Sequence, residues 1–138
     1  MITLIVGAKG EGKTKKLLEI AQNAIEKSNG NVIVIEKGSK LTYDIPHQAR
    51  LIDVDNYQVS GFDSFYGFLS GVCAANYDVT DIIVESTFKI CGNDFNQLEI
   101  FIKKLDKIST ESNVNIFLSV SADKNEIPEN IKSISEQI

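Results

Sequence analysis

The length of 138 residues predicts a single domain over residues 1–138. The formal net charge of −5 argues against nucleic acid as a general partner, since phosphate contacts need a basic surface. Hydrophobic residues make up 43% of the sequence, enough for a layered core, yet every apolar run is much shorter than the roughly 18 residues of a membrane span. The two cysteines form no C-x-x-C pair and give no support for a zinc site; we expect a cytoplasmic protein with Cys73 in the core, while a disulfide to Cys91 stays open.

The first predicted elements are a buried strand over residues 2–6 (ITLIV) and a helix over residues 13–28, which Asn29-Gly30 ends. Apolar residues recur on one face of this helix, namely Leu17, Leu18, Ala21, Ala24 and Ile25. Between strand and helix lies Gly-Ala-Lys-Gly-Glu-Gly-Lys-Thr at residues 7–14, which matches the phosphate-binding pattern G-x-x-x-x-G-K-[ST], called Walker A. A strand before the glycines and a helix after them are the context in which this pattern binds phosphate.

The residue types in this loop predict a nucleoside triphosphate ligand with Mg²⁺. Glycines let the backbone turn tightly with its N–H groups toward phosphate oxygens, and the helix adds its positive end. Lys13 is expected at the β- and γ-phosphates, and the Thr14 hydroxyl at the Mg²⁺ ion. We predict that the side chain of Lys9 faces solvent. The predicted nucleotide-binding residues are Gly7, Ala8, Lys9, Gly10, Glu11, Gly12, Lys13, Thr14 and Lys15.

Further strands are predicted over residues 31–35, 51–55, 81–85 and 114–120. Gly38, Pro46 and several polar side chains predict a long loop over residues 36–50. Continuous apolar strands that alternate with helices are typical of a parallel sheet covered on both faces. We therefore expect an α/β fold of three αβα layers, with a five-stranded, mostly parallel sheet.

Three more helices complete the expected fold. Ser60 and Asp63 resemble a capping box for the first, whose inner face would carry Phe62, Phe65, Leu69 and Val72. Asn93 or Asp94 opens a long second helix with Phe95, Leu98, Ile102, Leu105 and Ile108 on its inner face. A short C-terminal helix is expected from Ile127-Pro128, with Ile131, Ile134 and Ile138 turned inward.

Acidic residues close three of the predicted strands, at the sheet edge where parallel α/β folds bind ligands. They are Glu36, Asp53, Asp55 and Glu85. One strand-end acid is expected to hold Mg²⁺ together with Thr14. We rank Glu85 first, because of its place before the long helix, and Asp53 second, so the predicted metal-associated residues are Thr14, Glu85 and Asp53.

The order of strand, GAKGEGKT, helix and a later strand IIVE resembles the P-loop NTPase superfamily. The resemblance implies the P-loop NTPase type of fold, with Glu85 in the Walker B place. It also implies that Ser86 stands where many of these ATPases carry a catalytic glutamate. The segment GAKGEGKTKKLLE…NGNVIVIEKG looks like the start of thymidine kinase-type proteins, although their DE pair and cysteine zinc site are missing here. RecA-like motors and the short twitching-motility-type ATPases share the loop as well.

Three functions fit these features. The first is an ATP- or GTP-binding switch or assembly protein with weak or partner-activated hydrolysis, in which a partner, or Arg50 of a second copy in a homodimer, supplies the missing positive charge. The alternative is a small-molecule kinase that uses the 36–50 loop, with Tyr43, Asp44, His47 and Arg50, as a lid over its acceptor. The third is an interaction module on a degenerate fold, against which the intact Lys13-Thr14 pair argues. Whether the protein is an enzyme, such as a slow NTPase, stays open.

Overall fold

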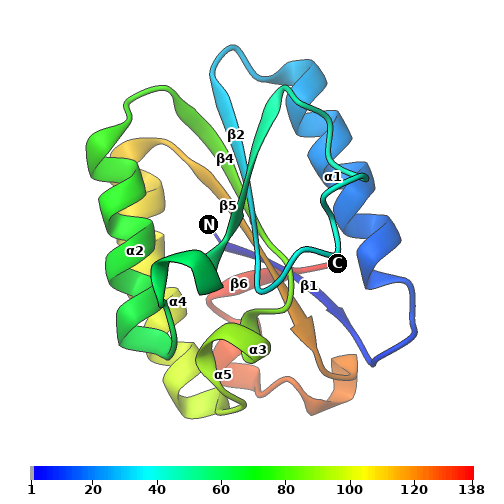
Figure 1. The fold of residues 1–138 in the computed structure, drawn as a ribbon. Helices are drawn as coiled ribbons and strands as arrows, with labels where there is room; N and C mark the ends of the chain where they lie inside the picture. The colour runs from blue at the N-terminus through cyan, green and yellow to red at the C-terminus, as the bar shows by residue number, and fades with distance from the viewer. Residues whose placement is uncertain (1) are drawn as a thin grey trace.

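Six strands form one sheet in the computed structural model, which describes residues 2–138 (Figure 1). Their order is β3-β2-β4-β5-β1-β6, and each neighbouring pair in this described sheet is parallel. The strands are β1 (Ile2–Gly7), β2 (Asn31–Glu36), β3 (Ala49–Asp53), β4 (Val79–Val84), β5 (Asn115–Ser121) and β6 (Ser135–Gln137). The expected α/β class and the parallel sheet are confirmed, but the predicted number of five strands is wrong, because β6 adds a sixth.

Helices cover both faces of the sheet and make three layers. Helix α1 (Lys13–Lys27) lies on one face, and α2 (Phe62–Ala75) and α4 (Phe95–Ser112) lie on the other (Figure 1). The short helices α3 (Thr87–Cys91) and α5 (Glu129–Lys132) lie near the carboxyl ends of the strands (Figure 1). None of the helices between residues 2 and 138 combines the length and apolar character that a membrane crossing needs.

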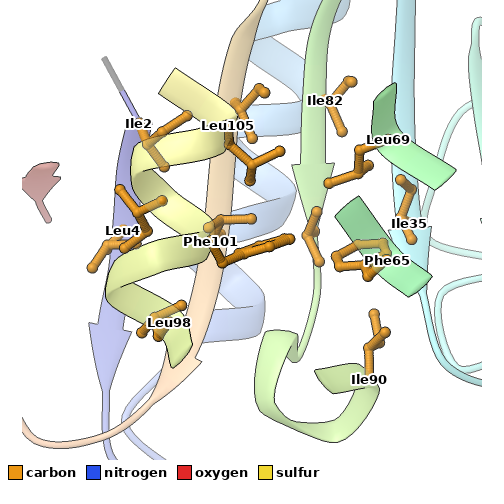
Figure 2. Close-up of a cluster of buried hydrophobic side chains, with 14 of the residues drawn as sticks. Ile2, Leu4, Ile35, Phe65, Leu69, Ile82, Ile90, Leu98, Phe101 and Leu105 are labelled. Carbon is orange, nitrogen blue, oxygen red and sulfur yellow. The ribbon is translucent and has the colours of Figure 1, made fainter. Parts of the chain in front are cut away.

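The larger apolar cluster lies between the sheet and the α2–α4 layer. Figure 2 shows Phe65 and Leu69 of α2 and Leu98, Phe101 and Leu105 of α4 against side chains of the central strands. The Phe101 ring lies 5.8 Å from the Phe65 ring in a stacked arrangement and meets Phe62 edge-on at 5.4 Å. These residues come from the predicted inner faces of α2 and α4, so the 3.6-residue periodicity identified both faces correctly, and Phe101 joins them.

A smaller apolar cluster lies under α1 and also includes part of the chain between β2 and β3. Leu17, Ala21 and Ala24 of α1 pack there with Leu41 and Ile45. Residues 37–48 have no helix or strand, as the loop prediction required, and this loop returns along the α1 face in the place of a crossover helix. The predicted loop was too long at both ends, because Glu36 belongs to β2 and Ala49 and Arg50 belong to β3.

The C-terminus departs most from the prediction. The helix expected from residue 127 is only the short α5, and β6 follows it and pairs with β1. The backbone N–H of Val6 donates to the Ile138 carbonyl at 3.0 Å, and the N–H of Ile138 donates to Leu4 at 2.9 Å. The Ile138 side chain is 41% exposed rather than inward. Pairing with the open edge of β1 overrides the helical spacing of the isoleucines, because an unpaired strand edge leaves backbone groups unsatisfied.

Two local predictions are also corrected. Gly61 with a φ of 91°, not Ser60, is the N-cap of α2, and the Ser60 N–H donates to Ser64 Oγ at 3.3 Å. The strand predicted over 51–55 runs two residues earlier, and a 3₁₀ turn (Val54–Tyr57) follows it.

Two alternatives that the sequence left open are decided by the structure. Asp94, rather than Asn93, is the N-cap of α4. Both cysteines are free, so the disulfide is absent from the described residues, and burial raises the pKa of the Cys91 thiol to about 12.

Candidate functional site

The segment after β1 forms a tight loop over which its own lysine folds back. Gly10 and Gly12 have φ angles of 88° and 83°, a region that side chains other than glycine rarely adopt. The Lys13 ammonium donates to the Ala8 carbonyl at 3.1 Å, and a Cβ atom on Gly7 would lie 3.2 Å from Lys13 Cγ. Glycine at position 7 therefore lets the Lys13 stem cross the loop close to its backbone.

The start of α1 carries three lysines, follows the exposed Glu11 and is open to solvent. Its N-cap is Gly12, with no side-chain cap and no acid in the first turn as the structure describes it. Lys13, Lys15 and Lys16 lie instead at this positive end of the helix dipole, where cations are unfavourable and an anion is stabilising. The first helical N–H groups have no carbonyl partner within the helix, as at any helix start. Lys9 is exposed, as predicted. Loop and helix together offer the donors and charge that a phosphate requires.

Strand order places the candidate acids at very different distances from this loop. Strand β4, which Glu85 follows, is two places from β1, with β5 between them, whereas β3, which ends at Asp53, is four places away. With strands about 4.8 Å apart, these separations correspond to about 10 Å and about 19 Å across the sheet. Ser119 of β5 is buried, and Ser121 pairs with Gly7, so both occupy the strand between the loop and Glu85.

Asp53 and Glu36 already have structural partners. Asp53 Oδ1 accepts hydrogen bonds from the N–H groups of Asp55 and Gly38, both at 2.9 Å. Both carboxylate oxygens of Glu36 accept from the Leu41 N–H at 3.2 Å. Burial is the main cause that raises the pKa of Glu36; the charges of Glu85 and Asp53 raise it further, against the lowering effect of the Leu41 N–H. These two acids therefore fasten the start of the β2–β3 loop.

Glu85 is the acid with unused bonding capacity. It is 6% exposed, and its Oε1 accepts from the Ser86 hydroxyl and from Lys40 Nζ, the latter at 3.3 Å. Glu85 Oε2 and the nearby Thr87 Oγ1 are buried and have no hydrogen-bond partner among the described residues. Ser86 holds this corner in a left-handed conformation with a φ of 59°. An unpartnered buried oxygen costs about 1–3 kcal/mol, and this one is able to accept a hydrogen bond or associate with a cation.

Within residues 2–138, no group of three or more histidine, cysteine, aspartate or glutamate side chains is arranged to hold a metal ion. A metal at this edge would need ligands from a bound phosphate, water and a hydroxyl, in addition to one carboxylate. That donor set is the one Mg²⁺ uses beside nucleotides, because Mg²⁺ retains several waters. Thr14 is exposed at the start of α1 and fits the role of the hydroxyl.

The side chains expected to form an acceptor lid do not gather at the glycine loop. Because β2 and β3 are parallel, the chain after Glu36 must return to the amino edge before β3 begins. His47 lies just before β3, and Arg50 is its second residue, paired with Ile33. Tyr43 is 98% exposed, and Asp44 is exposed as well. Gly38, Lys40 and Leu41 of this loop are tied to acids at the carboxyl edge, whereas the predicted lid residues are exposed or lie toward the amino edge.

No protein-family model matches the chain, and no curated protein matches it either. The site must be interpreted from its residues and their geometry.

Lys40 is a site residue that the sequence analysis did not identify; it contacts Glu85 from 45 positions away in the chain. No sequence signal distinguishes this lysine from others in polar loops, since only the crossover path brings it to the end of β4.

Proposed function

We propose that this protein binds ATP or GTP with Mg²⁺ at residues 7–14, as a P-loop protein whose weak hydrolysis serves a switch or an assembly step. One observation carries the proposal, namely the lysine-rich, uncapped start of α1 behind a loop of left-handed glycines. The lysines and the positive end of the helix dipole repel one another, and a bound polyanion offsets this repulsion. The loop N–H groups and Lys13 would hold the phosphates.

In this proposal Thr14 and Glu85 associate with Mg²⁺. Glu85 has an unpartnered buried oxygen and follows a strand only two places from β1. Asp53, the second candidate, is four places from β1 and is engaged in two backbone hydrogen bonds. Mg²⁺ would supply positive charge to the terminal phosphates, while the chain contributes one hydroxyl and one carboxylate.

The direct test is calorimetric titration of ATP, GTP and ADP into the purified protein, with and without Mg²⁺. We expect binding of at least one nucleoside triphosphate that Mg²⁺ strengthens. A protein that binds none of the three nucleotides in either condition would end the proposal. The same experiments with duplex DNA at physiological salt should show no sequence-specific binding, given the net charge of −5.

Substitution of the two candidate acids should separate their roles. We expect Glu85→Gln to weaken the Mg²⁺-dependent gain in ATP affinity about tenfold, the lower end of the range for groups around a metal. Asp53→Asn should change that gain by less than about twofold and leave the stability nearly unchanged, since Asp53 caps the 3₁₀ turn and asparagine caps about as well as aspartate. Titrations at several Mg²⁺ concentrations would measure both gains, and the opposite order would identify Asp53 as the metal-associated acid.

Hydrolysis by the isolated protein should be slow, well below the roughly 10 s⁻¹ that is typical of enzymes. Ser86 follows Glu85 and cannot act as a base, and its hydroxyl is engaged with that carboxylate. Arg50, the only arginine in the chain, lies in the outermost strand β3, away from the loop. Phosphate release would be measured over a range of protein concentrations. A specific rate that rises with concentration would support help from a second copy, whereas rapid, concentration-independent turnover would contradict the expectation.

A further inference from the structure

The first residues after β2 are fastened to the sheet edge by carboxylates. We call residues 37–41 the tethered segment. Its four contacts are Lys37 Nζ with Asp55 Oδ1 at 2.6 Å, Gly38 N–H with Asp53 Oδ1 at 2.9 Å, Lys40 Nζ with Glu85 Oε1 at 3.3 Å, and Leu41 N–H with Glu36 at 3.2 Å. Leu41 is also buried in the cluster under α1, so the segment has one apolar anchor and several polar ties.

The Lys40 tie differs from the others because it ends on the acid of the proposed nucleotide site. The Lys40 side chain is 55% exposed, whereas that of Glu85 is 8% exposed. Water can solvate the exposed Lys40 ammonium when it leaves, but the buried Glu85 carboxylate then requires another cation in its place. The carboxylate it would leave is buried, keeps the Ser86 hydroxyl on the same oxygen, and has its other oxygen unpartnered.

Glu85 cannot bind the Lys40 ammonium and a divalent metal ion equally well at the same time. A divalent ion associated with this carboxylate repels the Lys40 ammonium, which then needs another anion. The terminal phosphate of a triphosphate beside the same ion is such an anion, and a diphosphate lacks it. Arg50 cannot supply a further positive charge at that phosphate, since it lies in the outermost strand β3.

We propose, building on the nucleotide site proposed above, that Lys40 recognises the terminal phosphate and thereby couples triphosphate binding to the tethered segment. Without nucleotide, Lys40 neutralises Glu85 and closes the segment onto the sheet edge. With a Mg²⁺-triphosphate bound, Lys40 leaves Glu85 for the phosphate, and residues 37–40 move while Leu41 keeps its place in the core. The tethered segment thus has one conformation with a bound triphosphate and another with a diphosphate, and this difference lies at the protein surface.

The test compares the wild-type protein with Lys40→Gln and with the matched control Lys37→Gln. Both variants lose one ammonium from the same segment, but Lys37 pairs with Asp55 rather than with Glu85. We expect Lys40→Gln to lose about tenfold in Mg²⁺-ATP affinity by calorimetry and to bind ADP within about twofold of wild type, as befits one charge-assisted hydrogen bond. Lys37→Gln should keep the wild-type ratio of the two affinities.

Hydrogen exchange of the wild-type protein supplies a second measurement that needs no substitution. Peptides that cover residues 37–45 should change their exchange with Mg²⁺-ATP but not with Mg²⁺-ADP, and this difference should vanish in Lys40→Gln. Two results would overturn the inference: a ratio of ATP to ADP affinity in Lys40→Gln that equals the wild-type ratio, or identical wild-type exchange with ATP and ADP. Each leaves the proposed function standing, because that function is tested separately by nucleotide binding to the wild-type protein and to Lys13→Ala.

Discussion

Replacing Lys13 by alanine should lower the affinity for Mg²⁺-ATP by about a hundredfold while the fold stays intact. A charge-assisted hydrogen bond to an ionised group contributes about 1.5–3 kcal/mol, and the Lys13 ammonium would serve two phosphates. In the structure its hydrogen bond goes to the Ala8 carbonyl of its own loop, and the side chain is only half-buried. Its removal therefore leaves no core contact broken. Calorimetry would measure the affinity, and circular dichroism would verify the fold.

Lys16→Ala is the matched control for this substitution. It removes the same charge one turn further along α1, from an exposed side chain, and should change ATP affinity by less than about threefold, because surface charges act weakly at physiological salt. Equal losses in both variants would mean that only the general positive field attracts the nucleotide. Unchanged ATP binding in Lys13→Ala would refute the phosphate-loop assignment altogether.

A large loss of stability is expected from Leu17→Ala. Leu17 is fully buried and fastens the first half of α1, and with it the glycine loop, to the sheet. Truncation of a buried leucine to alanine usually costs about 2–5 kcal/mol, because transfer free energy is lost and a cavity remains. Urea unfolding followed by circular dichroism would measure the change in the free energy of unfolding.

The neighbouring Leu18 provides the control, because Leu18→Ala makes the same chemical change on the same helix at a half-buried position. Its cost should be clearly smaller than that of Leu17→Ala. Successive residues of a helix are about 100° apart, so the comparison measures which face of α1 meets the sheet. Equal costs for the two variants would show that α1 is rotated from the orientation described here, and Lys13 and Thr14 with it.

Local sequence patterns were sufficient for most elements and for the candidate phosphate loop. Residues 7–14 carry their geometry in their own composition, since glycines at positions 10 and 12 permit the left-handed turns observed there. The faces of α1, α2 and α4 followed from helical spacing, because burial on a helix repeats every 3.6 residues. Continuous apolar strands indicated a parallel sheet for the same kind of reason, since both of its faces are covered.

Tertiary structure alone decided which strand ends are neighbours and which acids are available. The strand order separates Asp53 from the loop by four places and Glu85 by two, although both acids follow short apolar strands in the sequence. The path of residues 37–48 takes His47 and Arg50 to the opposite edge and brings Lys40 to Glu85. The expected C-terminal helix is cut short at α5, because the residues after it pair with β1 as β6. Such long-range pairings depend on which surfaces are buried together, and no periodicity within a single segment encodes them.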